Sequence, residues 1–466
     1  MNRPKEFFDA IIIGGGPAGA FAGAKLAMAG HKVLILEKEI FPRPHVGESL
    51  VPFCYDLFEE IGVLDKLKSN FVRKPGVRFV NKTGEFDTIY CFKNILPGPN
   101  QLSFHVLRSE FDKILLDNAR DKGATVMEDV LVKDVDLSVE DAVTVYATNE
   151  DKELSFNARF LFDATGQDTF LGQKQRVKVK HKELDRIAFL THWKGADFVP
   201  SIREGLLNII YLAGNKKGWI GIQAVGEDRL SVGLVVDNIF TREMKEELSA
   251  KGTKDWKMEL YLQEIRSAAF TSDILKNAEI IQKLMVVGNY SYSMTKKHGS
   301  NYAMIGDAAS FLDPIFATGI YLAMNSAKVY SEALSVLLND GIEEGKKALN
   351  TATENFEGAV QLVDRFIRMF YDQERFNFAE LGQKLKERYG TNDDENFIQH
   401  QLAFGALHFM MGGDFFNENK RYHQTLDFLE NPGQFERYYY LVMNRDAYKE
   451  QGCPMPYEAI FPMSVR

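Results

Sequence analysis

The opening of the chain alternates apolar runs with a glycine-rich turn. Residues Ile11–Ile13 form an apolar run typical of a buried parallel strand, a helix rich in alanine follows, and a second apolar run, Val33–Leu36, ends at Glu37. Three glycines between the first run and the helix satisfy the spacing GxGxxG: Gly14, Gly16 and Gly19. This order of strand, turn, helix and strand predicts a Rossmann-like dinucleotide-binding unit.

Each part of this motif has a task in binding a dinucleotide. The first glycine permits a tight turn, the second lets the backbone approach a pyrophosphate, and the third lets the helix pack closely on the sheet. The free amides at the helix N-terminus then face the phosphates. Glu37 is placed to accept hydrogen bonds from ribose hydroxyls. The motif indicates an adenine dinucleotide and leaves FAD and NAD open.

The hydrophobic pattern changes character twice further along the chain. A helix is predicted within residues 107–126, followed by three strands of a β-meander that returns to the dinucleotide sheet, at 130–137, 143–147 and 156–163. From 186 to 237, short strands separated by glycine turns predict an antiparallel sheet. A strand is predicted at 301–305 and a helix at about 318–338. The rest of the chain is predicted to be helical nearly to its end.

Composition narrows the class of protein. The 466 residues are 45% hydrophobic and 26% charged, as in an ordinary globular protein, and the net charge of −9 argues against general nucleic acid binding. The longest apolar runs are too short for a transmembrane segment, so we expect a cytoplasmic protein. Cys54, Cys91 and Cys453 lack metal-ligand spacing and form no even framework, so they are predicted to be buried thiols.

Five segments in the same order as in a known family carry a resemblance. The chain resembles the FAD-dependent monooxygenases related to p-hydroxybenzoate hydroxylase, and within them the flavin-dependent halogenases of the phenol and pyrrole type. The segments are the glycine turn with Glu37, residues 41–52, Arg108, the turn 163–166 and residues 305–319. The resemblance implies an α/β fold, α+β overall. The expected domains are a discontinuous Rossmann-like FAD-binding domain (1–75, 100–180, 285–330), an interleaved antiparallel substrate sheet (76–99, 181–284) and a helical C-terminal domain (331–466).

The resemblance implies FAD as the cofactor. Asp307 follows a predicted strand, where its carboxylate can accept hydrogen bonds from the ribityl hydroxyls, and the small residues after it open a turn toward the pyrophosphate. Arg108 is implied as a further FAD contact. The residues expected to contact FAD are Gly14, Gly16, Pro17, Ala18, Gly19, Glu37, Lys38, Arg43, Ser49, Arg108, Gly166, Gly306, Asp307, Pro314, Thr318, Gly319 and Ile320.

The resemblance also implies a catalytic lysine, Lys74. In the halogenases a flavin C4a-hydroperoxide oxidises halide to hypohalous acid. A lysine then either becomes a haloamine or donates a hydrogen bond to the oxidant. Burial lowers the pKa of a lysine and leaves more neutral amine to act as a nucleophile. Without the family, a lysine beside Arg73 would be interpreted as a solvated surface residue.

Two further motifs match the halogenases only in part. Backbone amides of Thr318 and Gly319 are expected to hold chloride or bromide, although Ala317 replaces the serine of the halogenase motif. Phe316 stands where tryptophan halogenases carry a glutamate. The WxWxIP signature, thought to keep substrate away from the flavin, becomes Trp219–Ala224 with Gly221 in place of the second tryptophan, which removes a large wall.

Several functions therefore remain open beside a halogenase acting on an electron-rich aromatic or pyrrole ring. They are a flavin monooxygenase that hydroxylates its substrate, an FAD reductase of the polyprenyl type and a flavoprotein without turnover. The expected partners are a small-molecule substrate, free or tethered to a carrier protein, and a separate flavin reductase. A second GxGxxG unit is missing from the sequence, so NADH or NADPH has no dedicated Rossmann domain. Direct reduction by either nucleotide stays open all the same, because the resemblance includes single-component monooxygenases that bind it without such a domain.

Overall fold

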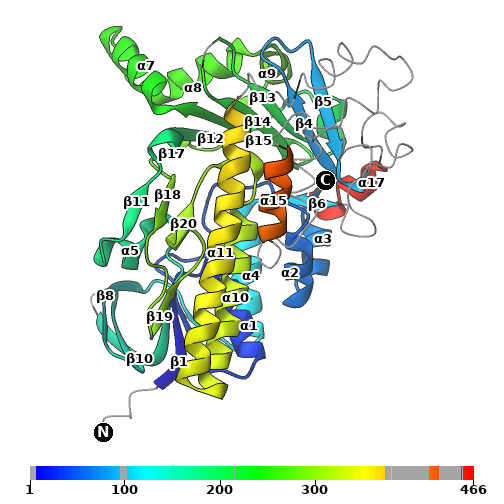
Figure 1. Cartoon of the computed structure of the whole chain (residues 1–466). Coiled ribbons are helices and arrows are strands. Elements are labelled where there is room, and N and C mark those ends of the chain that lie inside the picture. Colours follow the sequence, from blue (N-terminus) through cyan, green and yellow to red (C-terminus); the bar gives the residue numbers. More distant parts are fainter. Residues whose placement is uncertain are drawn as a thin grey trace.

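Two β-sheets organise the molecule. The computed structural model describes residues 7–94, 102–150, 152–214, 216–372, 379, 419–429, 453 and 455–465. In Figure 1 one sheet lies in the lower half beside helices α1 and α10, and the other lies in the upper half beneath α7, α8 and α9. The helices are α1 (Pro17–Met28), α2 (Cys54–Glu60), α3 (Leu64–Asn70), α4 (Arg108–Asp121), α5 (Phe170–Lys174), α6 (Pro200–Arg203), α7 (Asn238–Ala250), α8 (Trp256–Ser267), α9 (Ala269–Leu275), α10 (Gly319–Asp340), α11 (Ile342–Tyr371), α15 (Asn419–Leu429) and α17 (Tyr457–Ile460).

The lower sheet is the predicted dinucleotide sheet. Its order is β7-β2-β1-β10-β9-β8, and β19 also pairs with β10. Strand β1 is parallel to β2 and β10, and β8, β9 and β10 form the antiparallel meander that the hydrophobic pattern predicts. The strands are β1 (Phe7–Ile13), β2 (Val33–Leu36), β7 (Thr125–Met127), β8 (Leu131–Val139), β9 (Ala142–Asn149), β10 (Lys152–Asp163) and β19 (Tyr302–Met304).

The upper sheet is mixed. Its order is β16-β12-β15-β14-β13-β4-β5, with β17 beside β12. The run from β12 through β15 to β14 and β13 is antiparallel as predicted. Strands β13 and β4, which come from distant parts of the chain, pair in parallel. The strands are β4 (Gly76–Val80), β5 (Asp87–Cys91), β12 (Arg186–Lys194), β13 (Leu207–Tyr211), β14 (Trp219–Gly226), β15 (Arg229–Asp237), β16 (Glu279–Ile280) and β17 (Met285–Gly288).

The two faces of the upper sheet have different surroundings. On β14 and β15 one set of alternating residues is fully buried in an apolar cluster with residues of α7, α8 and α9; this set includes Ile220, Ile222, Val232 and Leu234. The other set faces the cavity described below. Two small sheets complete the fold: β3 (Val72–Lys74) with β6 (Ser103–His105), and β18 (Tyr292–Met294) between β11 (Lys178–Lys180) and β20 (Ser310–Phe311).

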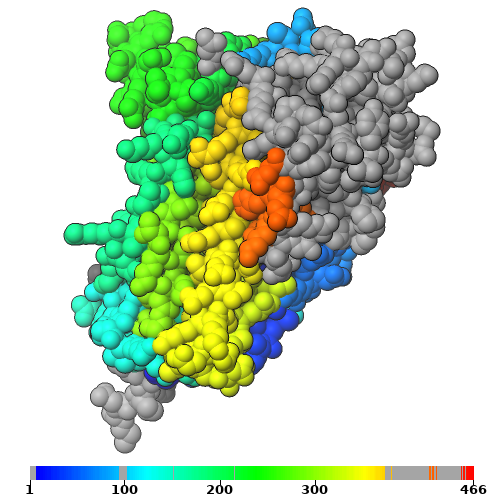
Figure 2. Space-filling view, in the orientation of Figure 1, coloured from blue at the N-terminus to red at the C-terminus, as the bar shows by residue number. Residues whose placement is uncertain are grey.

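Long helices run along one side of the molecule. Helix α11 packs against α10 and α15, and Figure 2 shows α11 and α15 side by side at the surface. The C-terminal region 331–466 was predicted to be helical, and α11 and α15 are its long described helices. The segments 373–378, 380–418 and 430–452 of that region lie outside the described residues. Among the helices that are described, none combines the length and apolarity needed to cross a membrane.

The prediction of three thiols is wrong for two of the cysteines. Cys91, at the end of β5, and Cys453 form a disulfide with their Cα atoms 5.5 Å apart. The third, Cys54, is free and buried, and burial raises the pKa of its thiol to about 12. Sequence spacing did not reveal this pair because 362 residues separate the two cysteines, and only the tertiary fold brings the C-terminal segment back to β5.

Candidate functional site

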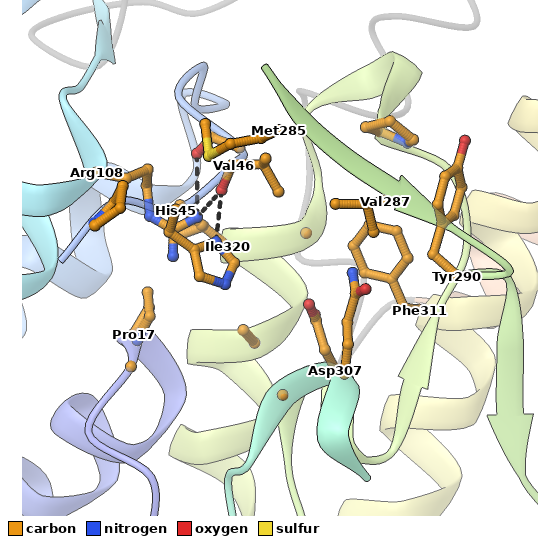
Figure 3. Close-up of a pocket in the computed structure, with 18 of the residues that line it drawn as sticks. Pro17, His45, Val46, Arg108, Met285, Val287, Tyr290, Asp307, Phe311 and Ile320 are labelled. Carbon is orange, nitrogen blue, oxygen red and sulfur yellow. Dashed lines mark hydrogen bonds between the residues drawn. The ribbon is translucent and has the colours of Figure 1, made fainter. Parts of the chain in front are cut away.

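A large cavity lies between the two sheets. It has a volume of about 1080 Å³ and is lined by the start of α1, the loop 43–49, the turn at Asp307, the start of α10 and the inner face of the upper sheet. Figure 3 shows His45, Val46 and Arg108 on one side of this space, Tyr290 and Phe311 on the other, and Pro17 and Asp307 below. The volume exceeds what a drug-sized ligand needs, which suits a dinucleotide together with a substrate.

The glycine turn forms the cradle that the sequence predicts. Gly14 has a φ of +105°, and a Cβ there would lie 2.4 Å from the carbonyl oxygen of Ala164. A Cβ on Gly19 would lie 1.9 Å from the carbonyl oxygen of Gly14, so α1 approaches the turn more closely than any side chain allows. Gly14 and Gly16 line the cavity, and the amides of the first turn of α1 have no partner within the helix. Phosphate oxygens fit this turn.

Glu37 lies where a ribose acceptor is expected. One carboxylate oxygen accepts a hydrogen bond from the amide of Gly15 at 2.6 Å, and the other accepts from the amide of Glu39 at 2.9 Å. The side chain is buried and lines the cavity. These two amides fix the carboxylate at the end of β2, and each oxygen keeps a second lone pair for a hydroxyl group.

Arg108 holds the loop that borders the cavity. Its guanidinium pairs with both oxygens of Asp112 at 2.8 and 2.9 Å and also donates to the carbonyl oxygen of Val46. Figure 3 shows Arg108 and Val46 facing each other across this contact. Arg108 also lines the cavity, so it is placed both to support the loop 46–47 and to contact a ligand.

Asp307 follows β19 and lies half-buried in the wall of the cavity. Burial raises the pKa of its carboxyl group to about 7, and the charge of Arg108 opposes that rise. Ser49 also lines the cavity, and its hydroxyl has no hydrogen-bond partner among the described residues. A half-buried carboxyl and a buried, unpartnered hydroxyl in the wall of a cavity both suit hydrogen bonds with the hydroxyl groups of a ribityl chain.

Most of the residues predicted to contact FAD line this one cavity. They are Gly14, Gly16, Pro17, Ala18, Glu37, Lys38, Arg43, Ser49, Arg108, Gly166, Asp307, Pro314, Gly319 and Ile320. Gly19, Gly306 and Thr318 are not in the wall. Gly306 serves packing, because a Cβ there would lie 3.1 Å from the Cβ of Ala18 and 3.2 Å from that of Ala323.

The turn before α10 is held by a chain of hydrogen bonds. The Asp313 side chain accepts from the amide of Ile315 at 3.1 Å and from the hydroxyl of Tyr371 at 3.0 Å, and that hydroxyl accepts from Nε1 of Trp219 at 3.0 Å. Ala317 has a φ of 55°, after which α10 begins at Gly319. Helix α10 therefore begins at the cavity, where Gly319 and Ile320 form part of the wall.

Lys74 is buried behind the loop that borders the cavity. Its amine donates a 3.0 Å hydrogen bond to the carbonyl oxygen of Leu50 and lies 5.5 Å from the centre of the Phe92 ring. The side chain is 1% exposed, and burial lowers its pKa to about 7. The interpretation as a solvated surface lysine is therefore wrong. Lys74 itself is not among the residues that line the cavity.

A polar cluster in the cavity wall was missed from the sequence. Glu48 lines the cavity, and its carboxylate lies 2.8 Å from Nε2 of His192, whose Nδ1 contacts the guanidinium of Arg229. Glu48 belongs to the segment 41–52 that carries the family resemblance, so the motif pointed to it. His192 and Arg229 lie on strands β12 and β15 and carry no local sequence signal.

Comparison with known proteins agrees with this geometry. Residues 8–363 match the FAD binding domain family. A 1H-pyrrole-2-carbonyl peptidyl-carrier-protein chlorinase of Pseudomonas fluorescens is 31% identical over 70% of this chain and 75% of its own length. Flavin-dependent halogenase armH3 of Armillaria mellea is 28% identical over 84% of this chain and 83% of its own. The structure of the myxobacterial chondrochloren halogenase CndH matches with a TM-score of 0.71 and 26% identity, over 95% of this chain and 99% of that chain.

The chain belongs to the FAD binding domain family. It is a halogenase-like, FAD-dependent oxidoreductase, as the sequence resemblance implied. FAD is its cofactor, and the glycine cradle, Glu37 and Asp307 are the residues suited to hold the pyrophosphate, the ribose and the ribityl chain.

Proposed function

We propose that the enzyme halogenates an electron-rich aromatic or pyrrole ring. The observation that carries this proposal is the amine of Lys74, which is buried, has a pKa lowered to about 7, and is held against the loop that borders the cofactor cavity. Among the described residues no carboxylate pairs with Lys74, and a buried amine of this kind is costly, so its presence favours a function. An amine that is neutral near pH 7 is suited to accept an electrophilic halogen.

The remaining roles are assigned to residues in the cavity wall and to Thr318 directly beside it. Reduced FAD, when bound, supplies the electrons that activate oxygen for halide oxidation. The amides of Thr318 and Gly319, at the start of α10, are proposed to hold the halide beside the cofactor, because a helix N-terminus favours anions. Their geometry needs no serine hydroxyl, so Ala317 is compatible with this role.

Lys74 is proposed to bind the hypohalous acid that leaves the cavity. In one version its neutral amine displaces water from the acid and forms an N–halogen bond, and the aromatic carbon then takes the halogen while the amine regains a proton from the ring. In the other version the protonated amine donates a hydrogen bond to the acid and activates it. Both versions need an amine kept from bulk water, as the burial of Lys74 provides.

The substrate is proposed to arrive free or attached to a carrier protein. The chlorinase relative, and a brominase relative from Pseudoalteromonas luteoviolacea that is 30% identical over 78% of this chain, are both named for a pyrrole-2-carbonyl group on a peptidyl carrier protein. Pyrrole-2-carboxylate offered free and on a loaded carrier protein distinguishes the two routes. A separate flavin reductase is proposed as the source of reduced FAD, and omission of that reductase from an assay with NADH tests it.

One observation favours a second function, hydroxylation of the substrate. Gly221 lines the cavity where the halogenase signature has a second indole, so of the two signature tryptophans only Trp219 remains, with its ring over Gly221, and no second indole obstructs approach to the cofactor. In that case oxygen would be transferred directly to the ring, and Lys74 would have a structural role only.

Replacement of Lys74 by methionine separates these functions. The purified enzyme receives FAD, a flavin reductase with NADH, bromide and resorcinol, and both brominated product and oxygen consumption are followed. We expect Lys74→Met to abolish the brominated product while oxygen consumption continues. Lys133→Met is the matched control, because Lys133 is exposed on β8. Unchanged bromination by Lys74→Met would contradict the proposed role of the lysine.

A further inference from the structure

The strand that carries Lys74 belongs to a small sheet that reaches the cavity wall. Strand β6 is its middle strand, and on one side Lys74 of β3 is opposite Ser103. On the other side residues 48–50 pair alongside β6, and Ser49 is opposite His105. Opposed residues of antiparallel strands have their side chains on the same face, as do alternate residues along one strand. The four side chains therefore share one face, which extends from the cavity wall at Ser49 to Lys74.

The Lys74 side chain lies across this face. Its amine donates to the carbonyl oxygen of Leu50, which is on the far side of β6, so the methylene groups pass over that strand. Lys74 and His105 are diagonal neighbours in the strand register, with Cβ atoms roughly 7–8 Å apart, a span that a lysine side chain covers. Burial lowers the pKa of the His105 imidazole well below its usual value, and the charge of the nearby Lys74 amine lowers it further. The imidazole is therefore neutral.

The neutral ring of His105 has its proton on Nε2. That nitrogen lies 2.9 Å from the carbonyl oxygen of Gly205, and a carbonyl oxygen only accepts hydrogen bonds, so Nε2 is the donor. Nδ1 is then an acceptor with a lone pair. It has no hydrogen-bond partner among the described residues, although the side chain is fully buried. Buried polar atoms are paired in folded proteins, so Nδ1 needs a donor.

The other polar groups beside the Lys74 amine are poor proton acceptors. Within the described ranges no carboxylate forms an ion pair with this amine. The Cys54 thiol lies near it, and burial raises the pKa of that thiol to about 12, so the thiol keeps its proton. The hydroxyl of Ser103 and the carbonyl oxygen of Leu50 accept hydrogen bonds but do not take up a proton at neutral pH. Nδ1 of His105 is the group on this face that is suited to accept one.

We propose that His105 is the proton acceptor of Lys74, with Nδ1 facing the amine directly or across one bound water. The inference rests on the proposed function and deepens it by supplying the base that the neutral-amine version needs. As the amine nitrogen bonds the halogen, the halogen–oxygen bond breaks and hydroxide leaves. The proton that the nitrogen loses passes to Nδ1 and from there to the hydroxide, which becomes water. A nitrogen that carries a halogen holds its proton far more weakly than an ammonium group, so even this weakly basic imidazole accepts it. His105 does not touch the aromatic ring and is a positioning residue that acts through Lys74.

Nitrogen NMR of the histidine rings tests the contact without any turnover. Oxidised, FAD-loaded enzyme with labelled histidine nitrogens is measured at about pH 8, where the Lys74 amine is largely neutral. The Nδ1 signal of His105, identified by its loss in His105→Gln or His105→Asn, is expected to be that of an unprotonated nitrogen that accepts a hydrogen bond. In Lys74→Met this signal should move downfield because the donor is gone. In Lys133→Met, the control exposed on β8, it should stay in place. A proton on Nδ1, or the same signal in Lys74→Met, would overturn the proposal.

Bromination by His105→Gln tests what this nitrogen does. The amide NH2 group of glutamine is able to keep the hydrogen bond to the Gly205 carbonyl, but the side chain has no basic nitrogen in place of Nδ1. In the assay with FAD, flavin reductase, NADH, bromide and resorcinol, we expect bromination to fall at least about tenfold while oxygen consumption is unchanged. His31→Gln is the matched control, because the His31 ring contacts the Ser335 hydroxyl and is outside the cavity wall. Wild-type bromination by His105→Gln would show that the ring only holds Gly205.

Failure of this inference differs from failure of the proposed function. The spectra report the contact between Lys74 and His105 whether or not any halogen is transferred. The proposed function fails if the wild-type enzyme forms no halogenated product. The role of His105 fails if the wild-type enzyme does form that product while the Nδ1 signal ignores Lys74→Met or His105→Gln brominates at the wild-type rate.

Discussion

The amine of Lys74 donates a hydrogen bond of 3.0 Å to the carbonyl oxygen of Leu50. Leu50 follows Glu48 and Ser49, which line the cofactor cavity, so the buried lysine is tied to the loop that borders that cavity. The contact satisfies one of the three donors of a protonated amine, and burial keeps the amine from bulk solvent. Lys74 is thus held in place, and its pKa of about 7 leaves a large share of the amine uncharged near pH 7.

The pH dependence of halogenation distinguishes the two versions of the role of Lys74. Burial lowers the pKa of this amine to about 7. If the neutral amine attacks the hypohalous acid, the rate of product formation should rise as the pH increases through about 7 and then level off. If the protonated amine activates the acid, the rate should fall over the same range. Product formed from hypobromite added directly, at a series of pH values, gives the measurement.

The same lowered pKa makes stability depend on pH. The amine has its ordinary pKa in the unfolded chain, so between about pH 7 and 10.5 the unfolded state binds more protons than the folded state. The free energy of unfolding contributed by Lys74 therefore rises with pH through this window. The Tm of the wild-type protein should increase relative to that of Lys74→Met between about pH 7 and 9. A constant difference would show that the amine is not desolvated.

Loss of the Glu37 carboxylate should weaken FAD binding. In Glu37→Ala the ribose loses a charged acceptor and the amide of Gly15 loses its 2.6 Å partner, so the Kd for FAD should rise by roughly 10- to 100-fold. Calorimetric titration of the apoprotein with FAD measures this change. Glu153→Ala, on the exposed part of β10, should bind FAD like the wild-type protein. An unchanged Kd in Glu37→Ala would remove Glu37 from the cofactor site.

Gly221 on β14 and Gly233 on β15, which face each other in the strand register, should respond differently to substitution by alanine. Gly221→Ala places a Cβ 2.8 Å from the Trp219 ring, so that ring must move and strain its 3.0 Å hydrogen bond to Tyr371. We expect a loss of about 1–3 kcal/mol in the free energy of unfolding, measured by denaturant titration. Gly233→Ala meets only contacts of 3.8 Å and should stay within about 0.5 kcal/mol of the wild type. Equal losses would mean that Trp219 does not cover Gly221.

The number of free thiols tests the disulfide between Cys91 and Cys453. Alkylation of the unfolded protein without a reductant should label one cysteine, Cys54, and alkylation after reduction should label all three, as intact mass reports. The Cys453→Ser variant should lose about 2–4 kcal/mol of stability, because the cross-link constrains the unfolded chain. Three labels without reduction would show that Cys91 and Cys453 are thiols under those conditions.

The local parts of the fold and site could be predicted from the sequence. The glycine turn between β1 and α1 follows from spacing, since Gly14 needs a positive φ and Gly19 lets α1 approach the carbonyl of Gly14, both within a few residues. Local signals also predict the antiparallel run from β12 to β15, whose turns carry glycines, and the position of Asp307 in the turn after β19. In each case short-range backbone geometry determines the conformation.

Features that depend on contacts between distant segments were not predictable. Glu48 meets His192 across 144 residues of sequence, and Cys91 meets Cys453 across 362. The pairing of Gly221 with Gly233 needs the register of two strands, which the hydrophobic pattern does not fix to a single residue. The burial of Lys74 likewise follows from the tertiary fold, and only the family resemblance singled it out.

The identity of the product is the most direct test of the central claim that this flavoenzyme is a halogenase. Wild-type enzyme with FAD, a flavin reductase, NADH, labelled oxygen gas and bromide is given resorcinol, indole or carrier-bound pyrrole-2-carboxylate, and the products are analysed by mass spectrometry. The account predicts a product with the isotope pair of bromine and without labelled oxygen, formed only when bromide is present. A product that carries labelled oxygen and forms equally well without halide would contradict it.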